Sequence, residues 1–134
     1  MSEKKLQVIT NSALWAAYGD ALGFITELTT SNSLSFRTDQ KIITKTVNWN
    51  RIIGGKFGTK ISLLSGTYSD DTQLRLATSR AIRDTGNFDV EAFAKIELPV
   101  WLSYALGAGR GSKEAASSLI KQNSNWFRDR KSVV

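Results

Sequence analysis

Apolar residues recur every three or four positions in four segments of the chain, a spacing typical of amphipathic helices. In one of them, Leu74, Ala77 and Ala81 form the apolar stripe, whereas Gln73 and Arg75 fall on the polar side. This pattern predicts a compact, all-α domain. The four segments lie at residues 5–19, 74–82, 90–105 and 113–121.

The first segment has small and branched apolar side chains on the face that we expect to be its inner face. These are Leu6, Ile9, Ala13, Ala16 and Ala17. Gly19 and Gly23 follow and bracket Asp20. Glycine at both positions predicts that the helix ends there or that another backbone approaches closely. We expect Asp20 to be structural and to form hydrogen bonds within this turn.

The long region from residue 28 to residue 67 lacks a helical repeat. It is rich in Ser, Thr, Asn and Gly, yet residues 41–49 and 51–53 carry β-branched and aromatic side chains. Such residues favour strands. We therefore expect a short hairpin near residues 41–53 that helps to shape the entrance of a pocket.

Three residues predict boundaries in the C-terminal half of the chain. Asp89 is a suitable N-cap for the segment 90–105, and Ser112 for the segment 113–121. Pro99 lies inside the first of these segments. Because proline lacks the backbone N–H, it should kink that helix or split it in two.

The composition restricts the possible chemistry. The 134 residues are 41% hydrophobic and 22% charged, which is ordinary for one globular domain, and the formal net charge is +6. Cysteine and histidine are absent, which excludes disulfides, thiolate nucleophiles, histidine-ligated zinc and a Ser-His triad. Any catalysis must use carboxylates, hydroxyls or a hard metal ion.

No apolar run approaches the length of a membrane span. The opening residues 1–5 are not followed by the hydrophobic region of a signal peptide. We therefore expect a cytoplasmic protein without a membrane partner.

The most informative stretch is Ser69-Asp70-Asp71, where a hydroxyl and two consecutive carboxylates precede the helical segment 74–82. These are hard oxygen donors of the kind that Mg²⁺ or Mn²⁺ prefers, and a short non-helical stretch would let them converge on one ion. The alternative is a helix cap, because Asp70 followed by Gln73 also fits a capping-box pattern.

A glycine-rich loop precedes the last helical segment. Gly107, Gly109 and Gly111 would let backbone N–H groups approach phosphate oxygens, and Arg110 would add positive potential. A flexible turn between two helices is the alternative, since glycine-rich loops are weak signals on their own.

Three motifs in this order resemble the ADP-ribosylglycohydrolase family, the dinitrogenase-reductase-activating glycohydrolase type. The first is Gly-Asp-Ala-Leu-Gly at residues 19–23 with Glu27 four residues later. The second is Tyr-Ser-Asp-Asp-Thr-Gln at residues 68–73, and the third is the loop that begins at Tyr104. The resemblance runs from about residue 9 to residue 121.

The resemblance implies hydrolysis of a glycosidic bond of ADP-ribose at a site with two Mg²⁺ ions, or Mn²⁺ in their place. It assigns Ser69, Asp70 and Asp71 to the metal and makes Glu27 and Asp71 catalytic, with Glu27 positioning water. It places the glycine-rich loop near the substrate diphosphate. The residues of the loop that it implicates are Gly107, Gly109, Arg110 and Gly111.

Members of the family are usually about twice as long, and their second half supplies further metal ligands. We therefore expect residues 1–134 to form one partial domain that lacks the C-terminal half of the family domain. A companion chain or a second copy would complete the site, and an ADP-ribosylated protein or small molecule would be the substrate.

Two alternatives remain open. The chain could keep the fold without turnover, as an ADP-ribose-binding protein or one subunit of a split enzyme. It could also be a small basic module for nucleic acid, although an anionic nucleotide-like substrate explains the charge as well, so we do not expect nucleic acid as the partner.

Overall fold

A computed structural model describes residues 2–54, 57–83 and 86–121, without the side chains of Ser31 and Asn32. The C-terminal part of the expected 1–134 domain, residues 122–134, lies outside the described residues. The chain forms two compact units, residues 1–69 and residues 70–134. As expected, helices predominate and one short antiparallel hairpin is present.

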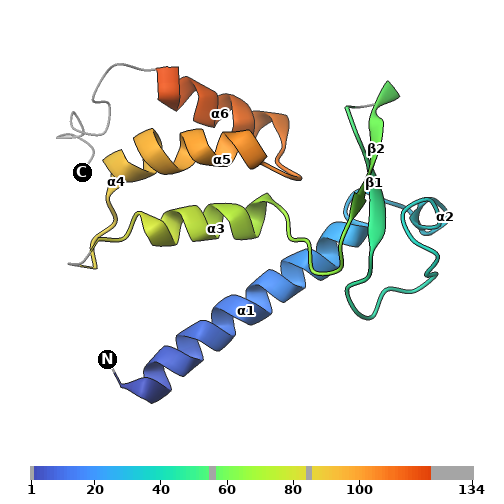
Figure 1. Cartoon of the computed structure of the whole chain (residues 1–134), viewed down its shortest axis with the longest axis horizontal. Helices are drawn as coiled ribbons and strands as arrows, with labels where there is room; N and C mark the ends of the chain where they lie inside the picture. The colour runs from blue at the N-terminus through green and yellow to red at the C-terminus, as the bar shows by residue number, and fades with distance from the viewer. Residues whose placement is uncertain (1, 55–56, 84–85, 122–134) are drawn as a thin grey trace, which may run out of the picture. The chain divides into compact units, whose positions relative to one another are not determined.

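In its described part, the first unit contains two helices and the hairpin (Figure 1). Ser2 caps α1 (Glu3–Thr26) and its side chain accepts a hydrogen bond from the Lys5 N–H. The short helix α2 (Ser31–Leu34) begins with a capping box between Thr30 and Ser33. Strands β1 (Trp49–Ile53) and β2 (Thr59–Leu63) follow.

Helix α1 does not end near Gly19, so that expectation was wrong. It continues through Gly19 and Gly23, and a Cβ at either glycine would meet no described atom within 4 Å, so no described backbone makes the close approach that was expected. Each glycine costs a helix about 1 kcal/mol relative to alanine. The burial of Phe24 and Ile25 in the last turns offsets this cost.

The hairpin forms later in the chain than expected. Residues 41–49 and 51–53 were expected to form it, whereas the structure pairs Trp49–Ile53 with Thr59–Leu63. The glycine-containing stretch from Gly54 to Gly58 explains the shift, because Gly54 has a φ of +94° that favours glycine. The buried Trp49 ring then packs edge-on against Phe24, with ring centroids 5.1 Å apart.

In the described part of the second unit the regular elements are all helices (Figure 1), and one isolated antiparallel bridge joins Ile82 to Phe88. Its core is formed by Leu98, Trp101 and Ala116, with Leu74 and Phe93 packed against them. Its elements are α3 (Asp70–Arg80), α4 (Val90–Ala92), the π-helical segment η2 (Phe93–Glu97), α5 (Leu98–Tyr104) and α6 (Arg110–Lys121).

The helical run of residues 90–104 changes its winding immediately before Pro99. Asp89 caps α4, as expected, and accepts a hydrogen bond from the Ala92 N–H at 2.9 Å. In η2 the Leu98 N–H reaches back five residues to the Phe93 carbonyl. A wider turn at this point accommodates a residue that has no N–H and whose ring crowds the preceding carbonyls.

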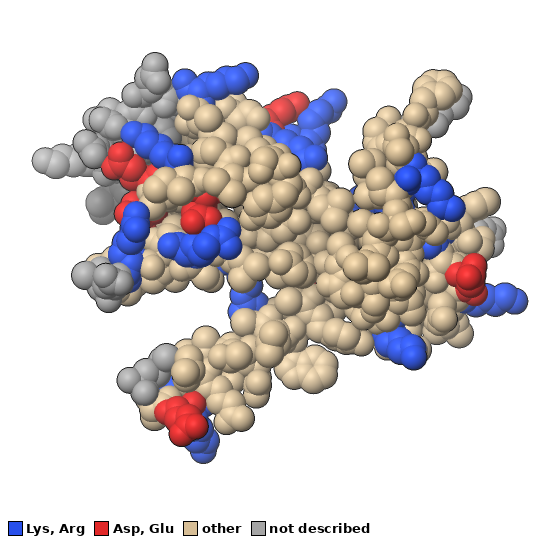
Figure 2. Space-filling model, viewed as in Figure 1, with Lys and Arg blue, Asp and Glu red and all other residues tan. Residues whose placement is uncertain are grey.

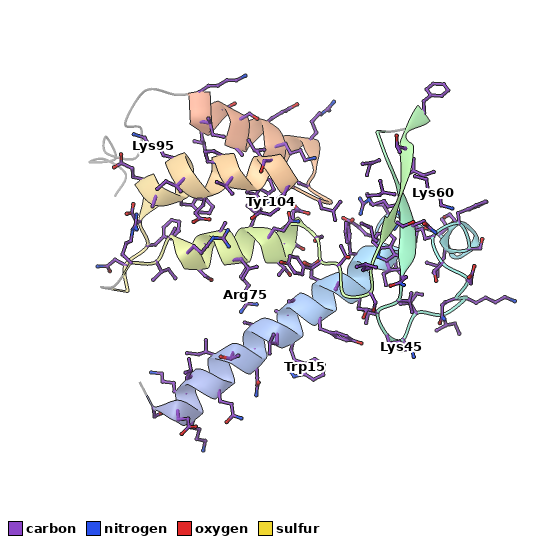
Figure 3. The ribbon with its side chains drawn as sticks, in the orientation of Figure 1. Trp15, Lys45, Lys60, Arg75, Lys95 and Tyr104 are labelled. Atoms are coloured by element: carbon purple, nitrogen blue, oxygen red, sulfur yellow. The ribbon has the colours of Figure 1, made fainter. Side chains whose placement is uncertain are left out.

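The expected inner face of α1 is largely exposed. Leu6 and Ile9 are about half exposed, and the Trp15 side chain projects from the helix (Figure 3). Between Leu6 and Gly19 the helix has no charged residue, and Figure 2 shows this stretch without Lys, Arg, Asp or Glu. The buried positions of α1 lie at its C-terminal end instead, at Ala21, Phe24 and Ile25.

Candidate metal and substrate site

Asp20 and Ser69 are joined by hydrogen bonds although they lie 49 positions apart in the sequence. The Ser69 hydroxyl donates to Asp20 Oδ1 at 2.6 Å, and the Ser69 N–H donates to both carboxylate oxygens at 3.2 and 3.1 Å. Ser69 is only 6% exposed. Asp20 thus makes a structural contact, but this contact reaches beyond its own turn, because α1 continues past it and directs the carboxylate to Ser69.

This contact leaves the hydroxyl chemically suited to a metal. Hydrogen bonds to a carboxylate are short and strong because the acceptor is charged. A hydroxyl that donates its proton in this way still carries oxygen lone pairs that can bind a cation. Asp20 therefore fixes the position of Ser69 and orients its hydroxyl proton away from any cation on the lone-pair side.

Asp70 and Asp71 occupy the first turn of α3, not a non-helical stretch. Asp70 is half-buried and Asp71 exposed. Because the helix begins at Asp70, Ser69 stands at the position before it, where an N-cap would be. Within the described residues, no three or more acidic, histidine or cysteine side chains lie together as a group that could hold a metal ion by itself.

Glu27 directly follows the last residue of α1 and forms an ion pair with Arg51 of β1. Arg51 Nη1 lies 3.4 Å from Glu27 Oε2, and the Glu27 side chain is 42% exposed. The Arg51 guanidinium also lies over the Phe24 ring, 4.4 Å from its centroid. The sequence pattern did not predict this pair. The sequence showed Arg51 only as a basic residue in the predicted hairpin, with no indication that it contacts Glu27.

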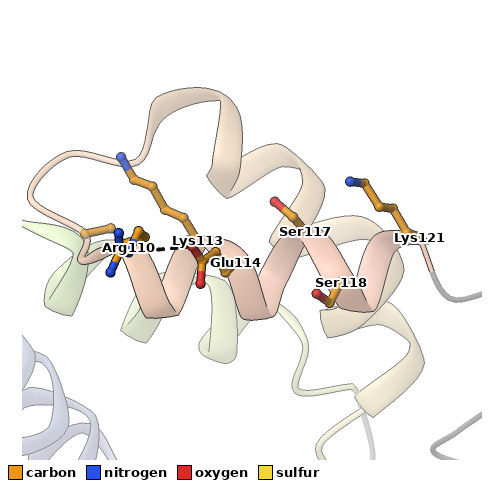
Figure 4. A pocket seen from close by; sticks show the side chains of 7 residues that line it. Arg110, Lys113, Glu114, Ser117, Ser118 and Lys121 are labelled. Atoms are coloured by element: carbon orange, nitrogen blue, oxygen red, sulfur yellow. Dashed lines mark ion pairs between the residues drawn. The ribbon is translucent and has the colours of Figure 1, made fainter. Parts of the chain in front are cut away.

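The glycine-rich loop is shorter than expected, because α6 already begins at Arg110. Gly111 and Ser112 thus lie within the helix, and Ser112 is not its N-cap. Gly107 has a φ of +89°, which favours glycine there. Arg110 pairs with Glu114 at 3.7 Å and lines a shallow cavity of about 630 Å³ (Figure 4).

Lysines and serines of α6 share this cavity with Arg110 (Figure 4). The Arg110 side chain is almost fully exposed. A surface-exposed ion pair contributes little to stability, so Arg110 can exchange Glu114 for another anion at small cost. The described cavity lining consists of Ala108, Arg110, Lys113, Glu114, Ser117, Ser118 and Lys121.

Gln73 has a structural role that the sequence analysis missed, because it placed this residue on the polar side of the helix. It is 7% exposed, and its Oε1 accepts hydrogen bonds from Trp101 Nε1 and from the Leu106 N–H, both at 3.2 Å. It thereby attaches α3 to the residue just before Gly107. Its spacing of four and eight residues from Ala77 and Ala81 was the signal that could have placed it on the buried face.

The chain is thus a mainly helical protein. At the start of one helix, a serine hydroxyl fixed by an aspartate directly precedes two consecutive carboxylates. The family model described as ADP-ribosylglycohydrolase matches residues 2–132. The chain therefore belongs to the ADP-ribosylglycohydrolase family, whose members hydrolyse ADP-ribose linkages. Comparisons with curated proteins and with solved structures gave no significant match. Within the described ranges, no helix has the length and apolar character to cross a membrane.

Proposed function

We propose that this chain provides part of a Mg²⁺-dependent hydrolase that releases ADP-ribose from a modified protein or small molecule. One observation carries the proposal beyond family membership. Asp20 holds both the N–H and the hydroxyl of Ser69, so a hydroxyl is fixed directly before the carboxylates of Asp70 and Asp71. All three are hard oxygen donors, which suit Mg²⁺ and also Mn²⁺.

Ser69, Asp70 and Asp71 would hold the metal from this chain. A divalent ion held there would supply orientation of the ribose hydroxyls and a more acidic bound water. The remaining donors of a two-ion site would come from a companion chain or from a second copy of this one. Asp20 acts through Ser69 and is a positioning residue.

The substrate would be held by groups at two other places in the chain. We assign the backbone of Gly107, Gly109 and Gly111 and the guanidinium of Arg110 to the diphosphate of ADP-ribose. We assign Glu27 to the attacking water, which adds its hydroxyl to C1 of the ribose while the leaving group takes up a proton. Such a reaction passes through a transition state with oxocarbenium character.

Release of ADP-ribose from ADP-ribosylated protein tests the proposal. The purified chain is assayed with Mg²⁺ or with a chelator, alone and as the Asp71→Asn variant. Glu91→Gln is the matched control, because Glu91 is a partly exposed acid of α4 whose partner is Lys95. We expect Mg²⁺-dependent release that falls about 100-fold in Asp71→Asn and is unchanged in Glu91→Gln.

Other outcomes identify the alternatives. Binding of ADP-ribose in calorimetry without release would identify an incomplete enzyme or one subunit of a split enzyme. Binding to DNA or RNA that weakens steeply with salt, without any release, would identify a nucleic-acid module. Equal release by the wild type and Asp71→Asn would contradict the assignment of the metal ligands.

A further inference from the structure

The end of α1 and the hairpin bring two arginines together in the first unit. Arg37 Nη1 donates to the Ile25 carbonyl at 2.9 Å, and its guanidinium lies 5.6 Å from the centroid of the Trp49 ring. Arg51 lies over Phe24, and its side chain is only 17% exposed. Each cation is thus held against an aromatic ring, a favourable contact for a guanidinium.

The backbone also fixes the position of Arg37. The Asn50 N–H of β1 donates to the Arg37 carbonyl at 2.8 Å, which attaches the segment after α2 to the hairpin. The side chain of Asn50 is held in turn by the Ser62 hydroxyl at 2.9 Å. The cations are therefore arranged by the fold before any ligand arrives, which lowers the cost of binding.

Positive charge exceeds negative charge at this place. Glu27 pairs with Arg51, but among the described residues no carboxylate forms an ion pair with Arg37 or Lys60. Burial lowers the pKa of Arg37, and the nearby Arg51 charge lowers it further. Like charges that are held together repel, and an anion would relieve this repulsion.

A cavity of about 460 Å³ opens beside these cations. Lys60 of β2, labelled in Figure 3, lines this cavity, and its cross-strand partner Ile52 lies on the same face of the hairpin. No acidic residue occurs in its described lining, which comprises Leu28, Thr29, Ser33, Phe36, Arg37, Asn50, Arg51, Ile52 and Lys60.

An adjoining cavity of about 280 Å³ shares Arg37 and Lys60 with the first one. Asp39 lines this second cavity and is exposed. The apolar part of the first cavity is also open to solvent, because Phe36 is 79% exposed and Ile52 64% exposed. An exposed aromatic ring next to Arg37 and Lys60, which form no ion pair with a described carboxylate, suits a ligand that has both a flat ring and an anionic group.

We propose that this hairpin cavity binds a nucleoside phosphate. The phosphate lies between Arg37 and Lys60, with Arg51 adding positive potential, and the base contacts Phe36 and Ile52. A phosphate is favoured over a single carboxylate because its larger charge matches several cations, and the planar guanidinium fits its oxygens. The described linings of both cavities do not include Ser69, Asp70 or Asp71, and the proposal does not rest on the proposed hydrolase activity.

This ligand chemistry occurs both in free nucleotides and in ADP-ribose. Isothermal titration calorimetry of the full chain in the presence of a chelator therefore uses AMP, ADP-ribose and adenosine as probes. The variant is Lys60→Gln, which changes an exposed side chain and leaves the contacts of the arginines in place. Lys45→Gln is the matched control, because Lys45 is an exposed lysine of the same unit that lies outside the lining of both cavities (Figure 3).

We expect AMP to bind, adenosine to bind at least about 10-fold more weakly, and Lys60→Gln to weaken AMP binding by about 10-fold, the size of one hydrogen bond to a charged group. If only ADP-ribose binds and Lys60→Gln weakens it, the cavity is part of the substrate site of the hydrolase and not a site for free nucleotides, which would overturn the proposal. Lack of binding by both phosphates, equal binding of adenosine and AMP, or equal affinities of Lys60→Gln and Lys45→Gln would overturn the proposal.

The arginine contribution is tested by Arg51→Gln, whose folding is checked by circular dichroism. A folded variant with at least about 10-fold weaker binding supports the site, because the potential from Arg51 is lost. A folded variant with unchanged binding would contradict the part assigned to Arg51. The Asp71→Asn variant distinguishes this cavity from the hydrolase site. We expect it to bind AMP with the affinity of the wild type even if its release of ADP-ribose is abolished.

Discussion

At the scale of single residues, Asp20 has the most consequential contact. Its carboxylate accepts from both donors of Ser69, which is buried and has little access to water as a replacement partner. Removing one side of such a contact leaves buried donors unsatisfied, which costs more than an average hydrogen bond contributes. Substitution of Asp20 should therefore affect the stability of the fold as well as the position of Ser69.

We predict that Asp20→Ala lowers the free energy of unfolding by about 2 kcal/mol, because the Ser69 N–H and hydroxyl lose a charged acceptor. Urea denaturation followed by circular dichroism measures this change. Asp39→Ala, an exposed aspartate of the same unit, should stay within about 0.5 kcal/mol of the wild type. Equal losses in the two variants would show that Asp20 holds nothing of special importance.

At the scale of elements, one side chain attaches α3 to the end of α5. Gln73 Oε1 receives the Trp101 indole N–H and the Leu106 backbone N–H. Trp101 is one of the most completely buried large side chains in the described part of the chain. The loop that begins after Leu106 therefore depends on a residue of a different helix for its starting position.

We predict that Gln73→Ala lowers the free energy of unfolding by about 2 to 3 kcal/mol, because two inward-facing N–H groups lose their acceptor and a small cavity forms. Thermal or urea denaturation measures the loss. Arg75→Ala on the exposed side of α3 is the control and should change stability by less than about 0.5 kcal/mol. An unchanged midpoint for Gln73→Ala would contradict this account of the loop.

The start of α4 should make stability depend on pH. The Ala92 N–H, and then the Arg83 guanidinium at 2.9 Å, hold the pKa of Asp89 below its usual value. A carboxyl with a lowered pKa in the folded state stabilises the fold above its unfolded pKa, about 3.9. This contribution is lost as the pH falls through the lower, folded pKa.

The stability difference between the wild type and Asp89→Asn should therefore be largest near neutral pH and shrink in acid. Denaturation midpoints between about pH 2 and pH 7 provide the measurement, across the range in which aspartate titrates. The same difference at both ends of this range would mean that the ionised carboxylate of Asp89 contributes nothing to the fold.

At the scale of the whole molecule, local sequence patterns predicted where helices occur better than they predicted the residues at which the helices begin and end. The apolar repeat located α3 and most of α6, and the cap at Asp89 followed from its side chain. The end of α1 could not be predicted in this way. It depends on Phe24 packing against Trp49, a contact between residues 25 positions apart that outweighs the two glycines.

In the candidate site, too, features that are local in the sequence were predicted and contacts between distant residues were not. The hydroxyl and carboxylates of residues 69–71 were recognisable because they are adjacent in the sequence. The bond from Asp20 to Ser69 and the pair of Glu27 with Arg51 were not, because they depend on how distant segments pack. The metal ligands and the role of Glu27 remain predictions.

The π-helical segment η2 is also a place where the chain can tolerate the deletion of one residue. A π-helical turn holds one residue more than the α-helical turn it replaces, so the loss of one residue there can be absorbed by local rewinding. In α3 the same deletion would rotate the following residues by about 100° and move Ala77 off the buried face. Single-residue deletions among relatives should therefore be tolerated just ahead of Pro99 and rare within α3.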